Sequence, residues 1–475
     1  MALLSPGEAI DLRVSATPEG AALTDARVTL SWAETAARSR AMAGALRWAG
    51  VREGDLVALA LGNSVELFLA TLAAQRLGAV PMPISPRLAS AERQAILDVS
   101  RPRLTIDAGD PLLHADCPPL EGDTAPAFLK ASMSGGSTGR PKAILSRLPA
   151  RFDPAAPLFG IPLGGTHLVA APCANSGPYT LALLALLRGT HLVLLPRFDP
   201  EAALAAIDRH AADFVFLVPT MMARIMALPA AVRGTFSLAS LQMVAHAGAK
   251  CGETVKRAWI DWLGPDRIQE FYAGTEAQGS TWIGGREWLA HPGSVGRPSA
   301  GTEIEIRDAA GQGCPPGIVG EIFMRPAGGP GSTYAYLGAT PNRAADGFES
   351  IGDLGWFDEE GYLYIADRRL DLILRGGVNV YPAEVELALE THEGVRAAVV
   401  IGLPDADLGQ RVHALIEAEA PLDEAALQAH AAALLSPPKR PASYEFVAGP
   451  LRDEGGKVRR SAFAGARAAP QEQRA

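Results

Sequence analysis

The sequence predicts an α/β protein, and three observations lead to this fold class. Through the first half of the chain, amphipathic helical patterns alternate with short apolar strands, which is typical of parallel sheets covered by helices. From about Gly301 the pattern changes to short strands separated by Gly and Pro turns, as in an antiparallel subdomain. After residue 371 there follows a mixed unit about the size of a small independent domain.

The first half contains two alternating units, each expected to form a doubly wound sheet. The first has predicted helices at 35–50 and 64–78 and predicted strands at 55–61 and 79–84. The second has predicted strands at 166–173, 213–219, 241–249 and 268–274, helices at 199–211 and 253–263, and a helix, turn and strand over 180–196.

The second half is expected to contain shorter elements. In the antiparallel subdomain, strands are predicted at 303–313, 320–325 and 361–369. In the C-terminal unit, strands are predicted at 372–380, 397–403 and 412–419, and helices at 382–390 and 423–435.

Composition indicates a soluble globular enzyme. The 475 residues are 48% hydrophobic and 20% charged, which is not the balance of a disordered or fibrous chain. The formal net charge of −9 gives no general attraction to nucleic acid or to an anionic membrane. The four cysteines lie far apart without C-x-x-C spacing, so we expect reduced thiols in a cytoplasmic protein. The protein is expected to be a monomer or a homodimer.

No targeting or membrane segment is expected. The start, MALLSPGEAI, lacks the basic region and long apolar run of a signal peptide. The most apolar stretch, 180–196, is interrupted by Arg188, Gly189 and His191, which makes it too polar to span a bilayer.

The stretch SMSGGSTGRPKAI at 132–144 is the most informative loop. It contains a formal G-x-S-x-G, but a nucleophile elbow needs a helix directly after the serine, and RPKAILS is predicted to be a strand. It also lacks the Gly-Lys-Ser/Thr of a Walker loop. The sequence GQGCPPG at 311–317 has the wrong spacing for a dinucleotide-binding turn.

The remaining interpretation is a hairpin loop that wraps a polyphosphate. Its glycines let the main chain approach closely, and its N–H groups, hydroxyls and lysine are phosphate donors. Taken alone, a flexible surface hairpin is an equally good interpretation. The candidate phosphate-binding residues are Ser134, Gly135, Gly136, Ser137, Thr138, Gly139 and Lys142.

The sequence SGGSTGRPK resembles the phosphate-binding loop of the adenylate-forming superfamily, which comprises acyl-CoA synthetases, luciferases and adenylation domains. Further motifs of that superfamily follow in order: EFYAGTE at 270–276, GSVGRP at 293–298, a ribose-binding and hinge segment at 350–373, RGGVNVYPAEVE at 375–386 and LRDEGGKVRR at 451–460. The motif sequences SGGSTGRPK, YAGTEAQG and HPGSVGRP are especially similar to those of bile-acid or steroid type CoA ligases.

The resemblance implies a reaction in which a carboxylate displaces pyrophosphate from Mg-ATP, so that positive charge is needed near the α-phosphate. It makes Lys457 the catalytic lysine, which by itself would be interpreted as an exposed residue of a basic tail. It also implies that Thr275 contacts the α-phosphate and that Glu276 holds Mg²⁺. Without the resemblance, this pair would fit a helix cap with an acidic first turn.

The resemblance assigns further ATP contacts. Tyr272 would offer its ring to adenine, Asp353 would accept the ribose hydroxyls, and Arg368 would also reach the ribose. The segment AHAGAK at 245–250 would read the adenine edge. With the phosphate loop and Thr275, the implied ATP-binding set therefore includes Gly248, Ala249, Tyr272, Ala273, Asp353 and Arg368.

The resemblance also implies an acyl pocket, a CoA channel and a mobile C-terminal lid. The acyl pocket would be formed by Asn175, Ser176, Ala247, Gly248 and Gly274. The small residues Ala247, Gly248 and Ala249 suggest a roomy, mostly apolar pocket that suits a bulky alicyclic or aromatic acid. The CoA channel would be lined by Gly376, Gly377 and Lys439, and the hinge would be Leu370.

Two departures from the superfamily pattern stand out. The hinge position is usually Asp or Lys and here is Leu370, and the usual aromatic-His pair is replaced by Ala174 and Asn175. The chain also lacks the aspartate with which amino-acid-specific domains pair the substrate ammonium.

The resemblance thus implies an ATP-dependent carboxylic acid:CoA ligase that uses ATP, Mg²⁺ and CoA, with an adenylation core at 1–369 and a lid at 370–475. Transfer of the acyl group to an amine or to a carrier protein is the alternative. A non-catalytic nucleotide-binding protein would be expected to lack Lys457 or the Thr275–Glu276 pair. A serine hydrolase would need a base for Ser137, and no histidine stands in a partner motif.

Overall fold

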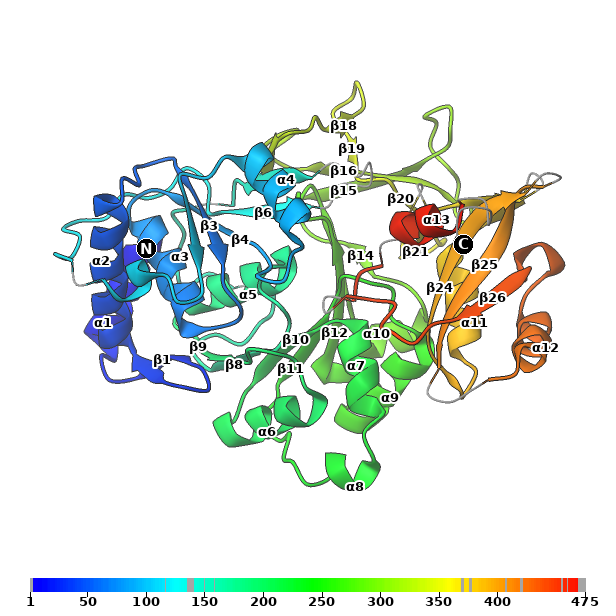
Figure 1. Cartoon of the computed structure of the whole chain (residues 1–475), viewed down its shortest axis with the longest axis horizontal. Helices are drawn as coiled ribbons and strands as arrows, with labels where there is room; N and C mark the ends of the chain where they lie inside the picture. The colour runs from blue at the N-terminus through cyan, green and yellow to red at the C-terminus, as the bar shows by residue number, and fades with distance from the viewer. Residues whose placement is uncertain are drawn as a thin grey trace, which may run out of the picture.

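The structure is a computed structural model with a large body and a smaller C-terminal unit, which Figure 1 shows side by side. It describes residues 3–115, 117–134, 141–148, 150–157, 159–368, 371–375, 378–405, 408–418, 422–453, 456–458 and 460–468; the side chains of Ser134 and Ala468 are not described.

The largest element of the body is a nine-stranded sheet. Its strand order is β14-β13-β12-β11-β10-β8-β9-β1-β2. The pairs from β12 to β1 are parallel, whereas β13, β14 and β2 pair antiparallel at the two ends. The strands are β1 Ala21–Thr24, β2 Thr29–Ser31, β8 Thr166–Val169, β9 His191–Leu194, β10 Phe214–Leu217, β11 Met243–His246, β12 Ile268–Ala273, β13 Ser280–Gly284 and β14 Arg297–Pro298.

This sheet has a topological switch point between β8 and β10. From β8 the chain passes through α5 (Ser176–Leu186) to β9 on one side, and then through α6 (Pro200–His210) to β10 on the other side. The carboxyl ends of the strands at such a point form a crevice in which α/β proteins bind ligands. Helices α7 (Pro219–Met226) and α9 (Glu253–Leu263), together with the short α8 (Ala230–Arg233), complete this half of the body.

The first alternating unit has one strand more than the two predicted, because Leu104–Asp107 adds a third. Its parallel sheet has three strands, β4-β3-β5, formed by β3 Leu56–Ala60, β4 Val80–Pro83 and β5 Leu104–Asp107. Helices α1 (Pro6–Ala16), α2 (Trp32–Trp48), α3 (Val65–Arg76) and α4 (Ser90–Ser100) belong to this unit. The hairpin of β1 and β2, which the sequence analysis did not predict, joins the larger sheet instead, because β1 pairs in parallel with β9.

Two antiparallel sheets complete the body. The first, of order β17-β7-β6, contains β6 Lys130–Ser134, β7 Lys142–Ser146 and β17 Tyr334–Leu337. The second contains β15 Thr302–Arg307, β16 Gly320–Pro326, β18 Asn342–Arg343, β19 Glu349–Ser350, β20 Asp353–Phe357 and β21 Leu363–Arg368. The short helix α10 (Gly285–Ala290) follows β13.

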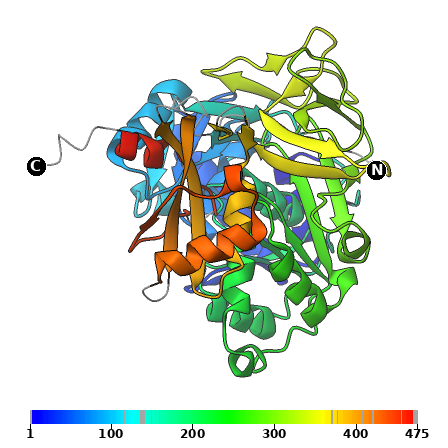
Figure 2. The same ribbon diagram turned by 90° about the vertical axis from the view of Figure 1, so that its right-hand side faces the viewer.

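The C-terminal unit has a core of its own. Its strands are β22 Ile373–Arg375, β23 Val378–Val380, β24 Val395–Asp405, β25 Gly409–Ala418 and β26 Ser443–Phe446, and its helices are α11 Pro382–Glu390, α12 Glu424–Leu434 and α13 Arg460–Ala468. Val385, Val400, Ile416 and Leu427 pack together in this core, separately from the cores of the body. Figure 2 shows the unit in orange, in front of the body.

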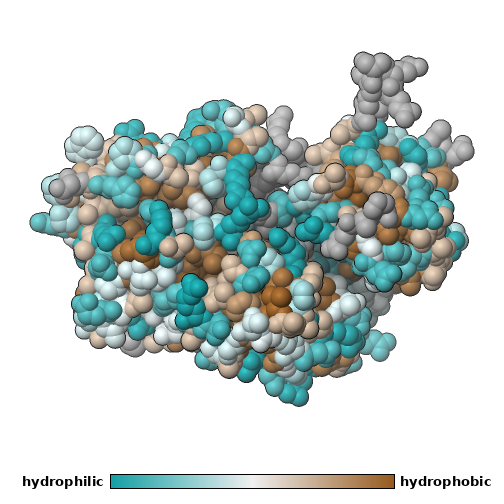
Figure 3. Space-filling view, turned by 60° about the horizontal axis from the view of Figure 1, so that its bottom comes forward, coloured by the Kyte–Doolittle hydropathy of each residue, from teal (hydrophilic) through white to brown (hydrophobic). Residues whose placement is uncertain are grey.

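Hydrophobic and hydrophilic side chains are interspersed over the face of the molecule in Figure 3. Within the part of the chain that the structure describes, no helix is both long enough and apolar enough to cross a bilayer. The carboxyl ends of β8, β10, β11 and β12 lie at or beside the switch point, which is where a ligand site is expected in such a sheet.

Candidate active site

The predicted acyl-pocket residues lie in the loops at the carboxyl ends of β8, β11 and β12. Asn175 and Ser176 begin α5 after β8, and Ala247 and Gly248 follow β11. A Cβ added to Gly177 would lie 3.9 Å from the Phe216 ring on β10, and one added to Gly248 would lie 3.8 Å from Val218 Cγ1. The start of α5 and the loop after β11 therefore both lie next to the carboxyl end of β10.

Small residues are required at two of these positions. Gly248 has a φ of +89°, a conformation that side-chain-bearing residues rarely adopt. A Cβ on Gly274, which follows β12, would lie 3.0 Å from Ile351 Cδ1 and 3.3 Å from Glu276 Oε2. Ala247 is buried and Ala249 is half-buried, whereas Ala273 at the end of β12 is exposed.

Glu276 is the centre of a compact polar cluster. Its side chain is buried, with 5% of the residue exposed, and Oε1 accepts hydrogen bonds from Lys142 Nζ at 2.9 Å and Tyr336 Oη at 2.6 Å. Lys142 Nζ also lies 2.7 Å from Tyr336 Oη. Burial and the Glu276 charge raise the pKa of Tyr336, so its hydroxyl remains a donor. Thr275 is half-buried in the turn just before this cluster.

The cluster fits a magnesium ion that arrives with ATP. Mg²⁺ prefers oxygen ligands and is usually held by one or two carboxylates together with substrate phosphates. Glu276 Oε2 makes no side-chain hydrogen bond to another described residue, whereas Oε1 is fixed by Lys142 and Tyr336. Within the described residues no group of three or more acidic, His or Cys side chains could hold a metal without a substrate.

Asp353 is the first residue of β20. Only 5% of the residue is exposed; Oδ2 accepts a hydrogen bond from Tyr272 Oη at 2.7 Å, and Oδ1 lies 3.3 Å from Arg368 Nε. Burial raises the pKa of Asp353, whereas Arg368 and the Tyr272 hydrogen bond oppose this shift. Three residues predicted to bind the nucleoside therefore contact one another.

We expect Asp353→Asn to raise the KM for ATP about 10- to 100-fold while changing kcat less, because a hydrogen bond to a charged group contributes about 1.5–3 kcal/mol. Initial rates of pyrophosphate release at varied ATP measure this effect. Asp346→Asn is the control, because Asp346 belongs to the same antiparallel subdomain but pairs with Arg307. Equal ATP kinetics in the two variants would contradict the ribose assignment.

Lys457 reaches the body from the C-terminal unit. The turn that carries it is closed by hydrogen bonds from Lys457 N to Asp453 Oδ1 at 2.8 Å and from Gly456 N to Asp453 O at 2.9 Å. A Cβ on Gly456, whose φ is +75°, would lie 3.1 Å from Thr220 Oγ1 at the start of α7. The lysine turn thus packs against the edge of the crevice.

The electrostatic surroundings of Lys457 connect it with the predicted ATP site. Lys457 is exposed, but nearby protein removes part of the solvation of its ammonium, and this lowers the pKa of Lys457. Asp453 and Glu276 oppose the shift, and Arg368 adds to it. The charges of Glu276 and Arg368 therefore act on Lys457 in this arrangement of the two units.

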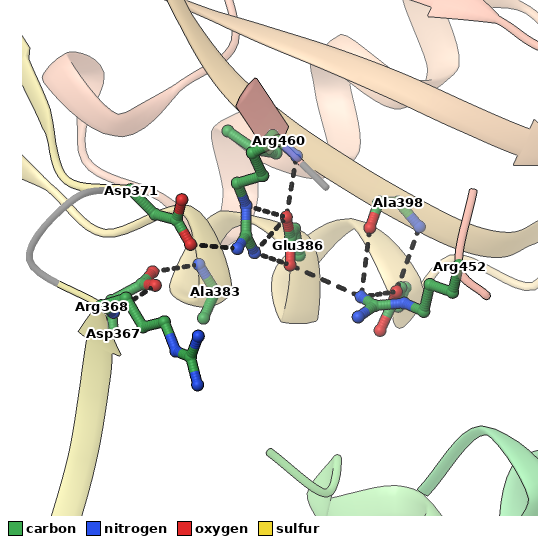
Figure 4. A network of polar contacts seen from close by, with 10 residues as sticks. Asp367, Arg368, Asp371, Ala383, Glu386, Ala398, Arg452 and Arg460 are labelled. Carbon is green, nitrogen blue, oxygen red and sulfur yellow. Dashed lines mark hydrogen bonds and ion pairs between the residues drawn. The ribbon is translucent and has the colours of Figure 1, made fainter. Parts of the chain in front are cut away.

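A polar network holds this arrangement, as Figure 4 shows. Asp367, at the end of β21, accepts a hydrogen bond through Oδ2 from Ala383 N in the first turn of α11 at 2.8 Å. Arg460 bridges Asp371 at 2.8 Å and Glu386 at 2.8 Å. Asp367 therefore caps a helix that lies beyond the predicted hinge, and this contact joins the body to the C-terminal unit.

We expect Asp367→Ala to slow adenylate formation several-fold without slowing acyl transfer, because a helix cap contributes about 0.5–2 kcal/mol and this cap joins the two units in the arrangement that brings Lys457 to the body. Single-turnover rates of the two half-reactions measure the effect. Asp423→Ala removes a similar cap, to Ala425 N, but within the C-terminal unit alone. If the two variants behaved alike, Asp367 would contribute only to helix stability.

Several predicted residues lie outside the described part of the chain. They are Gly135, Gly136, Ser137, Thr138 and Gly139 of the phosphate loop, Leu370 of the hinge, and Gly376 and Gly377 of the CoA channel. The described residues on either side of the loop form an antiparallel pair in which Ser134 is opposite Lys142, and Lys142–Ser146 is a strand, whereas a nucleophile elbow leads into a helix. Lys439 forms an ion pair with Glu384 at 2.6 Å.

Two residues of the site were not found from the sequence. Tyr336 belongs to an alternating strand pattern, and it reaches Lys142 and Glu276 only because β17 pairs with β7. Lys130 is buried and donates to Ser176 Oγ at 2.7 Å, and an isolated lysine in an apolar strand gives no signal of such a contact. A separate pocket of about 310 Å³, lined by Phe159, Gly160, Trp282 and Ser299, contains none of the predicted residues.

Comparison with known proteins gives matches over nearly the whole chain. Residues 10–129 and 132–337 match the family of AMP-binding enzymes, and residues 384–455 match the AMP-binding enzyme C-terminal domain. A feruloyl-CoA synthase of Amycolatopsis sp. is 33% identical over 427 residues, which cover 84% of this chain and 85% of the relative. A 2-succinylbenzoate–CoA ligase of Bacillus licheniformis is 29% identical, covering 94% of this chain and 97% of the relative.

Solved structures show the same architecture. The o-succinylbenzoate CoA synthetase of Bacillus subtilis in complex with its acyl-adenylate has a TM-score of 0.84 and 26% identity, covering 98% of both chains. An amide bond synthetase of Marinactinospora thermotolerans has a TM-score of 0.80 and 26% identity, covering 98% of this chain and 100% of the other. The mixed α/β fold with a smaller C-terminal unit is therefore confirmed.

Proposed function

Because this chain belongs to the family of AMP-binding enzymes, we propose that it is an ATP-dependent ligase that activates a bulky aromatic or alicyclic carboxylic acid as an acyl-adenylate and transfers the acyl group to CoA. The observation that carries the proposal is the convergence of Lys457, Glu276 and Lys142 on one crevice. Relatives that are CoA ligases, and a related structure with ATP and magnesium, support ATP, Mg²⁺ and CoA as co-substrates and cofactor.

The residues present supply the charge that adenylate formation requires. Attack of a carboxylate on the α-phosphorus brings negative charges together, so positioned cations lower the barrier. Lys457 would stabilise the attacking carboxylate and the α-phosphate, while Glu276 and the phosphates would hold Mg²⁺, which neutralises phosphate charge when bound. Asp353 and Arg368 would orient the ribose, and Tyr272 would offer its ring to adenine.

The substrate class is proposed from the crevice and from the relatives. Phe216 lies next to Gly177 at the start of α5 and forms an aromatic row with Phe271 and Trp282, at centroid distances of 5.8 and 5.4 Å. Such a row favours an acid that contains rings. Two of the relatives are named for ferulate and 2-succinylbenzoate, which supports an aromatic acid. A steroid-type acid, which the motif sequences shared with bile-acid or steroid type ligases suggest, stays a prediction.

CoA is the acceptor we propose, with an amine or a carrier protein as the alternative, because an amide bond synthetase also shares the architecture. The division at residue 369 belongs to the proposal and is supported by the separate C-terminal core. We also propose that the CoA channel is lined by Gly376, Gly377 and Lys439 and that Leu370 is the hinge. A cytoplasmic location and a monomeric or homodimeric state belong to the proposal as well.

The test is pyrophosphate release from Mg-ATP against aromatic, alicyclic, steroid-side-chain and fatty acids, with and without CoA. Acid-dependent release that becomes multi-turnover only with CoA is the expected result. Release that responds to an amine or a carrier protein instead would move the assignment to the corresponding acyltransferring ligase. Absence of release with every acid would refute the proposal.

A further inference from the structure

Lys130 has a buried amino group next to the proposed acid pocket. Only 2% of the residue is exposed, and Nζ donates hydrogen bonds to Ser132 Oγ and Ser176 Oγ, each at 2.7 Å. Among the described residues, no carboxylate forms an ion pair with it, and burial alone lowers the pKa of Lys130 to about 7. Buried charges are costly unless they are paired, so a buried lysine normally has an anionic partner. The amino group of Lys130 has none among the described residues.

Ser176 connects the Lys130 amino group to the proposed acid pocket. It is the first residue of α5 and is half-buried, in contrast to Lys130 and Ser132 behind it. Since Ser176 Oγ accepts a hydrogen bond from Lys130, its own proton is left to be donated. The backbone N–H groups at the start of α5 also favour negative charge, and Asn175 makes no side-chain cap there.

Two independent features place Lys130 and Ser176 far from the reacting carboxyl. Ser176 follows β8 and Thr275 follows β12, and three strand spacings between these strands amount to roughly 14 Å. Along β6, Lys130 lies four residues before Ser134, which is opposite Lys142 next to Glu276, again roughly 14 Å. One carboxylate therefore does not reach both ends of the crevice.

We propose that Lys130 and Ser176 form a specificity site for a second anionic oxygen group of the substrate, so that the preferred acid carries a carboxylate at the far end of its ring system. The inference rests on the proposed function and adds the substrate class to it. The aromatic row from Phe216 would contact the rings, and the Ser176 hydroxyl with the ammonium behind it would bind the distal carboxylate. The two residues would act on recognition, not on the chemical step.

Matched acids that differ only in the distal group test the proposal. The pairs are terephthalate with 4-methylbenzoate, 4-carboxycinnamate with 4-methylcinnamate, and biphenyl-4,4′-dicarboxylate with 4′-methylbiphenyl-4-carboxylate, which span increasing lengths. We expect the carboxylate member of at least one pair to have a kcat/KM for AMP formation at least about tenfold higher, because charge-assisted hydrogen bonds are strong. A preference for the methyl member in every pair would overturn the proposal.

Variants assign the preference to these side chains. Ser176→Ala and Lys130→Met should each reduce the carboxylate-to-methyl ratio to about one. Ser146→Ala is the matched control, because Ser146 is a buried hydroxyl directly opposite Lys130 in the hairpin but does not bond to it. A ratio that persists in Ser176→Ala, or that falls equally in Ser146→Ala, would refute a specific role for the pair.

Binding separates this inference from the proposed function. Calorimetry of the same acids in two buffers of different ionisation enthalpy should show proton uptake at pH 7.5 for the dicarboxylate, because an anion raises the pKa of Lys130, and no uptake in Lys130→Met. In the described structure only the Ser132 and Ser176 hydroxyls bond to this amine, and no charged group shifts its pKa. Proton uptake without AMP formation would support the anion site and refute the proposed ligase function. AMP formation from the monocarboxylates alone, without proton uptake, would support the ligase function and refute the anion site.

Discussion

Replacing Lys457 with alanine should reduce the rate of adenylate formation about 10²- to 10³-fold, which is the usual loss when one stabilising donor is removed from a transition state. The KM values for ATP and acid should change little, because the lysine is proposed to act on charge that develops during the attack. Acid-dependent exchange of pyrophosphate into ATP measures this step. Acyl transfer from a pre-formed acyl-adenylate should keep its rate within about threefold if Lys457 serves only the first step.

Arg467→Ala is the matched control, since Arg467 is another cation of the C-terminal unit and pairs with Glu445 on its own surface. If Lys457→Ala kept more than a tenth of the wild-type exchange rate, or lost both half-reactions equally, the assigned role would be wrong. Equal losses in Arg467→Ala would indicate a general effect of charge or folding on the C-terminal unit.

The pH dependence gives a second measurement on Lys457. Loss of solvation lowers its pKa, and the proposed role requires the charged form, so adenylation should decline as pH rises through this lowered pKa. The sign follows because an amine is charged only below its pKa. In Lys457→Arg the decline should shift to higher pH, since a guanidinium stays protonated. The kcat/KM profile is the appropriate measurement, because it reports the free enzyme.

The elements that could be predicted from the sequence are those with a long, regular pattern. Helix α9 occupies Glu253–Leu263, the predicted range, and β6 and β7 form the predicted hairpin. The strands β1 and β2 were missed because four and three residues carry too little periodicity to be recognised. The pairing of β1 with β9 joins residues that are far apart in sequence, such as Leu23 and Leu192, which local patterns do not encode.

The same limit applies to the candidate site. Glu276 and Asp353 could be proposed because they lie in motifs with fixed spacing, and the structure places them beside Lys142 and Tyr272. Tyr336 is 194 residues from Lys142 in sequence, and its position depends on how β17 pairs with β7. Side chains that complete a site through strand pairing therefore require a three-dimensional structure.

Replacing Glu276 with glutamine should raise the Mg²⁺ concentration needed for half-maximal adenylation about 10- to 100-fold, because loss of even a group that supports a metal ligand has an effect of that size. Glutamine keeps the shape of the side chain and its bond from Tyr336 but removes the charge that pairs with Lys142. Titration of Mg²⁺ at fixed ATP, with pyrophosphate release as the measurement, reports the shift. Excess Mg²⁺ should restore part of the activity.

Glu349→Gln is the matched control for this change, because Glu349 repeats the local chemistry of Glu276 next to the same strand. It is buried, accepts a hydrogen bond from Tyr334 Oη at 2.8 Å and pairs with Arg343, while Tyr334 lies two residues before Tyr336 on β17. Both variants leave a cation without its carboxylate, so each should unfold at a lower temperature. Only Glu276→Gln should change the Mg²⁺ requirement, and an equal shift in Glu349→Gln would show that the effect comes from loss of stability and not from loss of a metal ligand.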